Sequence, residues 1–172
     1  MKTINSLLVA LVTLFALSFL MPSCGKKTTP APATNVVTTP TYTFSAFGIT
    51  AIGVQYNITN PNTGPLKISA SNSSSSNSTN YQTVDITINS AVNSVGTYPL
   101  SSSSGNTGLY TSGGNTVRYT TNATYTGNLT ISSIDMIHKT ITASYNFSAQ
   151  QYYPSSGSGG SISGSFTNVS FQ

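Results

Sequence analysis

Residues 137–149 read IHKTITASYNFSA, and this stretch decides the fold class. Apolar and polar side chains alternate along it with a period of two, which is the period of a β-strand and not of a helix. The apolar side chains share one face of the predicted strand: Ile137, Ile141, Ala143, Tyr145 and Phe147. Thr, Ser and Asn occupy the other face. The stretch therefore predicts a strand with one buried and one solvated face, as in an antiparallel sheet.

The same alternation recurs through residues 41–172, where no segment has a helical period. It is seen at 52–58, 66–70, 81–90, 117–119, 125–131 and 162–171. Turn-forming residues separate these segments at 60–65, 71–80, 101–108, 112–115, 132–138 and 154–160. We therefore predict an all-β domain over residues 41–172. Its fold is an antiparallel β-sandwich or a partly closed barrel of about eight or nine strands.

The parity of the apolar positions changes within the last predicted strand. Ile162 and Phe166 are even-numbered, whereas Val169 and Phe171 are odd-numbered. A regular strand would expose one of these pairs, so the change predicts a β-bulge near Thr167–Asn168. The first predicted strand shows the same change of parity between 42–44 and 47–49.

The composition leaves little material for acid, base or metal chemistry. Only 5% of the 172 residues are charged, with two acidic residues and one histidine in the whole chain. Within 41–172 the charges are Lys67, Arg118 and Lys139 against Asp85 and Asp135. No cluster of Lys and Arg is present to contact several phosphates, which argues against nucleic-acid binding. The residues also predict no metal site and no cofactor.

The N-terminus has the pattern of an export signal. Lys2 precedes an almost wholly apolar run at 4–20, and the sole cysteine of the chain, Cys24, follows after Met21, Pro22 and Ser23. This pattern predicts a lipoprotein signal peptide over 1–23, forming a helix, with lipidation of Cys24 by acyl chains such as palmitate. Residues 24–40 would then be the lipidated cysteine and a disordered, Pro- and Thr-rich linker. The alternative is an uncleaved signal anchor, since 4–21 approach the length of a membrane span.

Several strings in the second half of the chain resemble a known family. They are Gly96-Thr97-Tyr98, residues 126–149, and Gly164-Ser165-Phe166-Thr167-Asn168-Val169 within 160–171. They resemble a domain of unknown function found in Bacteroidota lipoproteins, with the likeness stronger over 95–172 than over 41–94. The resemblance implies a lipoprotein with an all-β body. It supplies no activity and no catalytic residues.

The few acidic residues and the single histidine are better explained as turn and surface residues than as a catalytic site. Asp135 and His138 are three residues apart in one predicted turn, and Ser133 lies nearby. These three types make up a hydrolytic triad, yet Asp is also a favoured turn residue through its bonds to the backbone. Asp85 lies on the polar face of its strand, where a solvated or cross-strand charge is expected. A calcium site at Asp85 or Asp135 lacks further support. We predict no catalytic and no metal-binding residues.

Tyrosines are the better candidates for a ligand-binding surface. Tyr152 and Tyr153 are adjacent where the strand alternation ends and a Gly/Ser-rich loop begins. Adjacent side chains of a strand point in opposite directions, so at least one ring should be exposed. Tyr110, in a Ser/Gly-rich segment, is a weaker candidate. Exposed tyrosines can stack on a sugar and donate hydrogen bonds to a glycan or a protein.

The sequence therefore predicts a non-enzymatic bacterial envelope lipoprotein whose loops contact a glycan or an envelope or surface protein. Its lipid anchor would hold it at the outer membrane, facing either the periplasm or the cell surface. One alternative is a structural lipoprotein without a discrete ligand. The least favoured is a hydrolase that uses Asp135 and His138.

Overall fold

The computed structural model describes residues 41–51, 54–72, 80–114, 116–154 and 157–172. The predicted signal peptide, Cys24 and the linker lie outside these residues, as does most of the predicted loop at 71–80. The described residues form eleven strands and no helix. The strands are β1 (Thr41–Ala46), β2 (Ile49–Thr50), β3 (Gln55–Ile58), β4 (Leu66–Ser71), β5 (Gln82–Ile88), β6 (Gly96–Leu100), β7 (Thr107–Ser112), β8 (Val117–Thr120), β9 (Gly127–Asp135), β10 (Thr140–Tyr153) and β11 (Gly159–Ser170).

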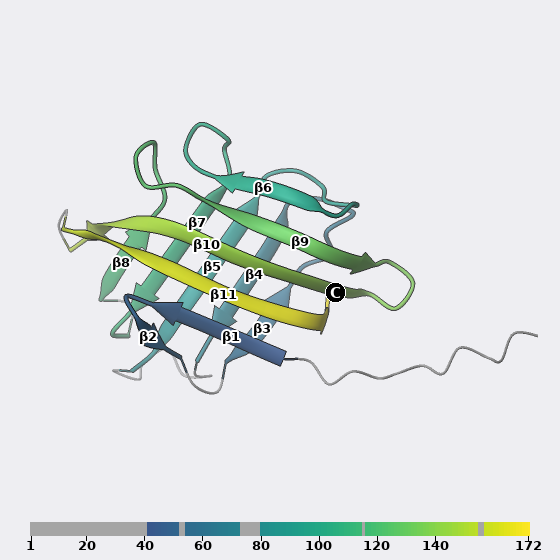
Figure 1. Ribbon diagram of the computed structural model, residues 1–172, viewed down its shortest axis with the longest axis horizontal. Helices are drawn as coiled ribbons and strands as arrows, with labels where there is room; N and C mark the ends of the chain where they lie inside the picture. The colour runs from purple at the N-terminus through teal and green to yellow at the C-terminus, as the bar shows by residue number, and fades with distance from the viewer. Residues whose placement is uncertain (1–40, 52–53, 73–79, 115, 155–156) are drawn as a thin grey trace, which may run out of the picture. The chain divides into compact units, whose positions relative to one another are not determined.

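All strand pairs are antiparallel, which confirms the predicted fold class. Nine strands follow one another in the order β2-β1-β11-β10-β8-β7-β5-β4-β3, and the sheet curls into a half-barrel (Figure 1). β6 and β9 branch from this path. The branch arises because one edge of the long strand β10 is divided. Its residues 140–147 pair with β9, whereas Gln150–Tyr153 pair with β8.

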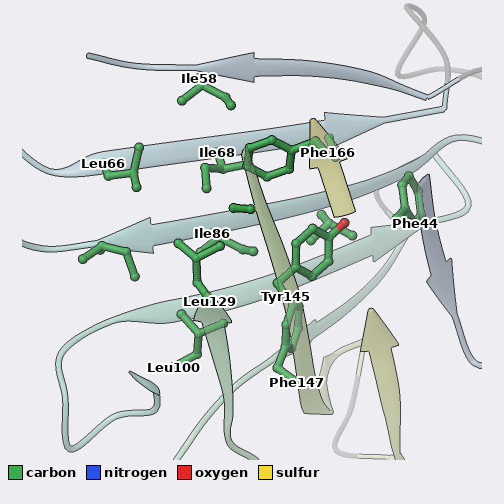
Figure 2. Packing of buried hydrophobic residues seen from close by; sticks show 14 of the residues in the cluster. Phe44, Ile58, Leu66, Ile68, Ile86, Leu100, Leu129, Tyr145, Phe147 and Phe166 are labelled. Carbon is green, nitrogen blue, oxygen red and sulfur yellow. The ribbon is translucent and has the colours of Figure 1, made fainter. Parts of the chain in front are cut away.

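The core lies on the concave side of the curled sheet and is built on β10. Ile141, Ala143, Tyr145, Phe147 and Ala149 are all buried, as the alternation predicts. Their side chains meet those of β3, β4 and β5 (Figure 2), which come from the far end of the strand order. Aliphatic residues of these strands that are fully buried include Ile58, Leu66, Ile68, Ile86 and Ile88. Burial of this apolar surface supplies the main drive for folding.

The structure places Ile137 outside this core, contrary to the sequence prediction. β9 continues to Asp135, through most of the predicted 132–138 loop, and β10 begins only at Thr140. Ile137 is therefore in the turn between them and is 89% exposed. Two features close this turn. The Asp135 carboxylate accepts main-chain hydrogen bonds, and Lys139 adopts a left-handed conformation with φ of 53°.

The predicted β-bulge is confirmed at its predicted place. Ile141 pairs with Val169 but Ala143 pairs with Phe166, so β11 carries one more residue than β10 across this step. Asn168 takes a left-handed φ of 52°, and its N–H donates to the Thr142 hydroxyl at 3.0 Å. The extra residue lets both Phe166 and Val169 face the core. The parity change in the first strand has another cause, a tight turn at Phe47–Gly48 that joins β1 to β2.

A tyrosine pair joins β3 to the β10 side of the half-barrel. The Tyr56 hydroxyl donates to the main-chain oxygen of Thr43 at 3.1 Å, and the Tyr145 hydroxyl lies 3.2 Å from that of Tyr56. Burial raises the pKa of Tyr56 to about 12, although the hydrogen bond with Tyr145 lowers it. Burial also raises the pKa of Tyr145 far above its usual range. Both phenols are therefore neutral structural groups at any physiological pH.

Candidate functional site

Tyr152 and Tyr153 lie at the end of β10, beyond the part of the strand that supports the core. Here Tyr119 pairs with Gln151 but Arg118 pairs with Tyr153, so Tyr152 is an extra residue in β10. Such an irregularity changes the direction in which neighbouring side chains point. Tyr152 is 47% exposed and Tyr153 is 52% exposed, the two highest values among the described tyrosines. Both tyrosine rings are therefore accessible, whereas the strand alternation predicted that at least one of them would be exposed.

Arg118 supplies a cation to this surface. Its guanidinium carbon lies 5.8 Å from the centre of the Tyr153 ring, within the range of a cation–π contact. Arg118 itself is exposed on β8. We call Arg118, Tyr152 and Tyr153 the tyrosine rim. Its aromatic faces can stack on a sugar ring or an apolar side chain, and its guanidinium and phenols can donate hydrogen bonds.

Tyr110 does not belong to this surface, so its prediction as a ligand-binding residue is corrected. It lies within β7 and not in a loop, and it is only 3% exposed. Its ring packs 5.7 Å from that of Phe47 and 5.8 Å from that of Tyr119. Burial raises the pKa of Tyr110, although a hydrogen bond with Ser112 lowers it. The small neighbours Gly108 and Ser112, which suggested a loop, instead lie in the same strand.

Asp135 and His138 do come together, in the turn between β9 and β10. One Asp135 oxygen accepts the N–H groups of Ile137 and His138, each at 2.9 Å. The other oxygen lies 2.6 Å from Nδ1 of His138. Both side chains are exposed. No serine hydroxyl contacts the imidazole within the described ranges, and Ser133 lies in β9, paired with Thr142. These bonds form a polar turn, and they provide no nucleophile.

The pH dependence of this turn tests the arrangement. Hydrogen bonds from the backbone and side chain of His138 hold the pKa of Asp135 below its usual 3.8. Because the pKa of Asp135 is lower in the folded state than in the unfolded state, its carboxylate stabilises the turn at pH values above the unfolded-state pKa. This stabilisation is lost as the pH falls through the folded-state pKa. We expect the NMR shifts of the Ile137 and His138 amides to titrate with a midpoint below 3.8. Asp135→Asn should abolish this titration while keeping the turn, and a midpoint at or above 3.8 would contradict the geometry.

A polar hollow of about 250 Å³ lies on the outer face of β3, β4 and β5. Its polar lining consists of Asn57, Thr59, Lys67, Ser69, Asp85 and Thr87. Asp85 pairs with Ser69, and Thr87 pairs with Lys67, which puts the two charges one step apart on the same face. The hollow is smaller than the roughly 300–1,000 Å³ of common small-molecule sites. It can accept at most one sugar ring or one side chain.

Asp85 is on the solvated face, as its place in the strand predicts, and Lys67 is its nearest cationic neighbour in the register. No ion pair joins these two residues in the part of the chain that the structure describes. The sequence did not indicate the hollow itself. The alternation shows that Asn57, Lys67 and Asp85 face the same side of their strands, but it does not show that β3, β4 and β5 are neighbours.

The described ranges contain no group of three or more His, Cys, Asp and Glu side chains that could hold a metal ion. They also contain no helix that is long and apolar enough to cross a membrane. Two surfaces thus stand out for binding, the tyrosine rim and the polar hollow. They lie on different strands, so the concave feature and the exposed tyrosines are not one site.

Comparison with known proteins identifies the family of the chain. No curated protein and no solved structure matches it significantly. One family model, described as a domain of unknown function (DUF6252), matches residues 52–171. The match includes the strings in 96–171 that suggested a lipoprotein domain of unknown function, and it extends through β3, β4 and β5. The chain therefore belongs to this family of domains of unknown function, DUF6252.

Proposed function

We propose that the protein is a lipid-anchored, non-catalytic binding module of a bacterial outer membrane. It faces either the periplasm or the cell surface, and its tyrosine rim contacts a glycan or an envelope protein. The anchor and the rim have separate evidence. The anchor rests on the N-terminal sequence, and the rim rests on the exposure of two adjacent tyrosines beside an arginine.

The anchor is a lipidated Cys24. This cysteine directly follows an apolar run and a Ser, and no other cysteine exists to pair with it in a disulfide. A cysteine that carries two or more acyl chains is held stably in a bilayer. Lys26 and Lys27 follow after Gly25 and add favourable contacts with anionic headgroups. Residues 25–40 then join this anchor to β1.

The observation that supports binding most directly is the exposure of Tyr152 and Tyr153. Exposed tyrosines are enriched at interfaces because a ring buries a large area at a small entropic cost. Arg118 beside Tyr153 adds a donor for hydroxyl or carboxylate groups. Sugars that carry both an apolar face and acidic or hydroxyl substituents suit this combination.

The alternatives differ in what they require of these residues. A structural lipoprotein would need no contact at the tyrosine rim. A hydrolase would need a nucleophile beside His138, and we do not propose one, because the hydrogen bonds of Asp135 are those of a turn. The rim is thus the feature on which the binding proposal depends.

Photo-cross-linking in cells tests the proposal. A photoreactive amino acid placed at Tyr153 of the full chain should give a discrete adduct, and Tyr152→Ala combined with Arg118→Ala should weaken it roughly tenfold or more. The same probe at the exposed Ser102, in the β6–β7 turn, is the matched control. Sensitivity of the adduct to glycosidase or to protease distinguishes a glycan from a protein. Equal cross-linking at both positions, or none at Tyr153, would favour the structural alternative.

A further inference from the structure

The turn between β9 and β10 presents apolar side chains to solvent. Ile137 is 89% exposed, the highest value among the exposed large hydrophobic residues that the structure describes, and Met136 beside it is 37% exposed. Lys139 is also exposed. We call Met136, Ile137 and Lys139 the hairpin tip. In Figure 1 this turn projects beyond the neighbouring strands, at the right of the view.

The fold does not require apolar residues at this position. The turn is closed by the Asp135 carboxylate, which accepts two main-chain N–H groups, and by the left-handed Lys139. The side chains of Met136 and Ile137 take no part in these bonds. Turns on protein surfaces favour Gly, Asn, Asp and Ser, and such residues dominate the other turns of this chain. Met136 and Ile137 are adjacent and both exposed, so together they form a small apolar protrusion that would gain free energy by entering an apolar environment outside the domain.

The register of β9, β10, β11 and β1 places the hairpin tip and the start of β1 at the same end of these four strands. Asp135 pairs with Thr140, and Thr140 pairs with Ser170. Thr41 pairs with Thr167, three residues from Ser170 along β11. At about 3.3 Å per residue, Thr41 lies roughly 10 Å along the strand direction from the base of the turn. The chain therefore enters the domain beside the hairpin tip.

The length of the chain before β1 restricts how the domain can face a bilayer. The 16 residues 25–40 separate Cys24 from Thr41, and even a fully stretched chain of this length spans at most roughly 53–58 Å. β10 alone has 14 residues and is roughly 48 Å long. Only a tether stretched almost to this limit would let the opposite end of the domain rest on the bilayer, so the length of the tether favours contact through the entry end. That end carries the hairpin tip.

We propose that the hairpin tip inserts Met136 and Ile137 into the headgroup region of the anchoring membrane, with Lys139 beside the lipid phosphates. This inference rests on the lipid anchor of the proposed function. A lipid surface suits the tip better than a protein pocket does, because an apolar protrusion flanked by a cation matches an anionic interface. The Asp135 carboxylate already accepts three hydrogen bonds within the turn. The tip fixes the orientation of the domain, so that the tyrosine rim at the other end of β10 points away from the bilayer.

Depth-dependent fluorescence quenching tests this orientation. The full chain carrying Met136→Cys, with an NBD probe on the new thiol, is reconstituted in phosphatidylethanolamine–phosphatidylglycerol vesicles that contain doxyl-labelled lipid. We expect a blue shift of the emission and quenching at least threefold stronger than for the same probe at Ser102→Cys. Ser102 is exposed in the β6–β7 turn, two residues after Leu100. Leu100 pairs with Gly127, at the end of β9 opposite the hairpin tip. Ile137→Ser, added to the Met136→Cys protein, should return the probe to the Ser102 level.

Flotation of the same vesicles separates failure of the tip from failure of the anchor. A chain that floats with the vesicles but gives equal quenching at positions 136 and 102 would overturn the role of the hairpin tip and leave the anchor intact. A chain that does not float would overturn the anchor, and with it the basis of the inference. Since Ile137 is exposed in the turn, Ile137→Ser should leave the thermal unfolding midpoint unchanged, so that loss of quenching is not loss of folding.

Discussion

Phe147→Ala is expected to destabilise the protein by about 3–5 kcal/mol, the usual cost of removing a buried phenylalanine. Phe147 is fully buried, and its ring lies in the core near that of Tyr145, with 6.2 Å between the ring centres (Figure 2). It belongs to β10 where that strand pairs with β9. On its other side it packs so closely against β7 that a Cβ atom at Gly108 would lie 3.1 Å from the ring. Truncation of Phe147 would leave a cavity between β10 and β7.

Urea unfolding followed by near-ultraviolet circular dichroism measures this loss. The matched control is Tyr152→Ala, which removes an aromatic ring of similar size from the same strand at an exposed position. We expect the control to change the free energy of unfolding by no more than about 0.5 kcal/mol. A similar change for Phe147→Ala would contradict the arrangement of the core around β10.

Gly127→Ala is expected to destabilise the protein by about 1–3 kcal/mol or more, because the new methyl group has no space. Gly127 begins β9 and pairs on one side with Phe147 and on the other with Leu100. A Cβ atom at this position would collide with the main chain of Asn146 and Phe147. Main-chain atoms of a central strand cannot rotate away as a side chain can, so the β9–β10 pairing must move.

Gly64→Ala provides the control for the glycine substitution. Gly64 lies in the turn between β3 and β4, and a Cβ atom there would have no neighbour within 4 Å. The same chemical change should therefore be neutral, or stabilising by up to about 1 kcal/mol through the unfolded state. Equal unfolding midpoints for the two variants would show that β9 does not approach β10 as closely as described.

The faces of the strands could be read from the sequence, but their neighbours could not. Alternation in 140–149 correctly placed Tyr145 and Phe147 in the core, and the change of parity correctly placed the bulge at Asn168. Both features depend on local geometry with a period of two. The division of β10 between β9 and β8 depends on contacts between distant segments, which no local pattern encodes.

Local patterns also failed where a turn or a small residue changed the context. Ile137 has the parity of the β10 core residues, but the bonds of Asp135 and the conformation of Lys139 close the turn before it can join them. Tyr110 lies among Ser and Gly, yet Gly108 and Ser112 belong to the same strand, β7, in which Tyr110 is buried. The exposure of at least one of Tyr152 and Tyr153 was predictable because the end of an alternating pattern marks the end of the core, whereas the position of Arg118 beside Tyr153 was not.

Fatty-acid labelling tests the central claim, that Cys24 anchors a binding module to a membrane. Cells that express the tagged full chain are grown with an alkyne-labelled palmitate, and the protein is isolated from the membrane fraction. We expect label on the wild-type chain and on Tyr152→Ala, with loss of both the label and membrane attachment in Cys24→Ala. Attachment that persists without label in Cys24→Ala would contradict the lipoprotein account and favour an uncleaved N-terminal anchor.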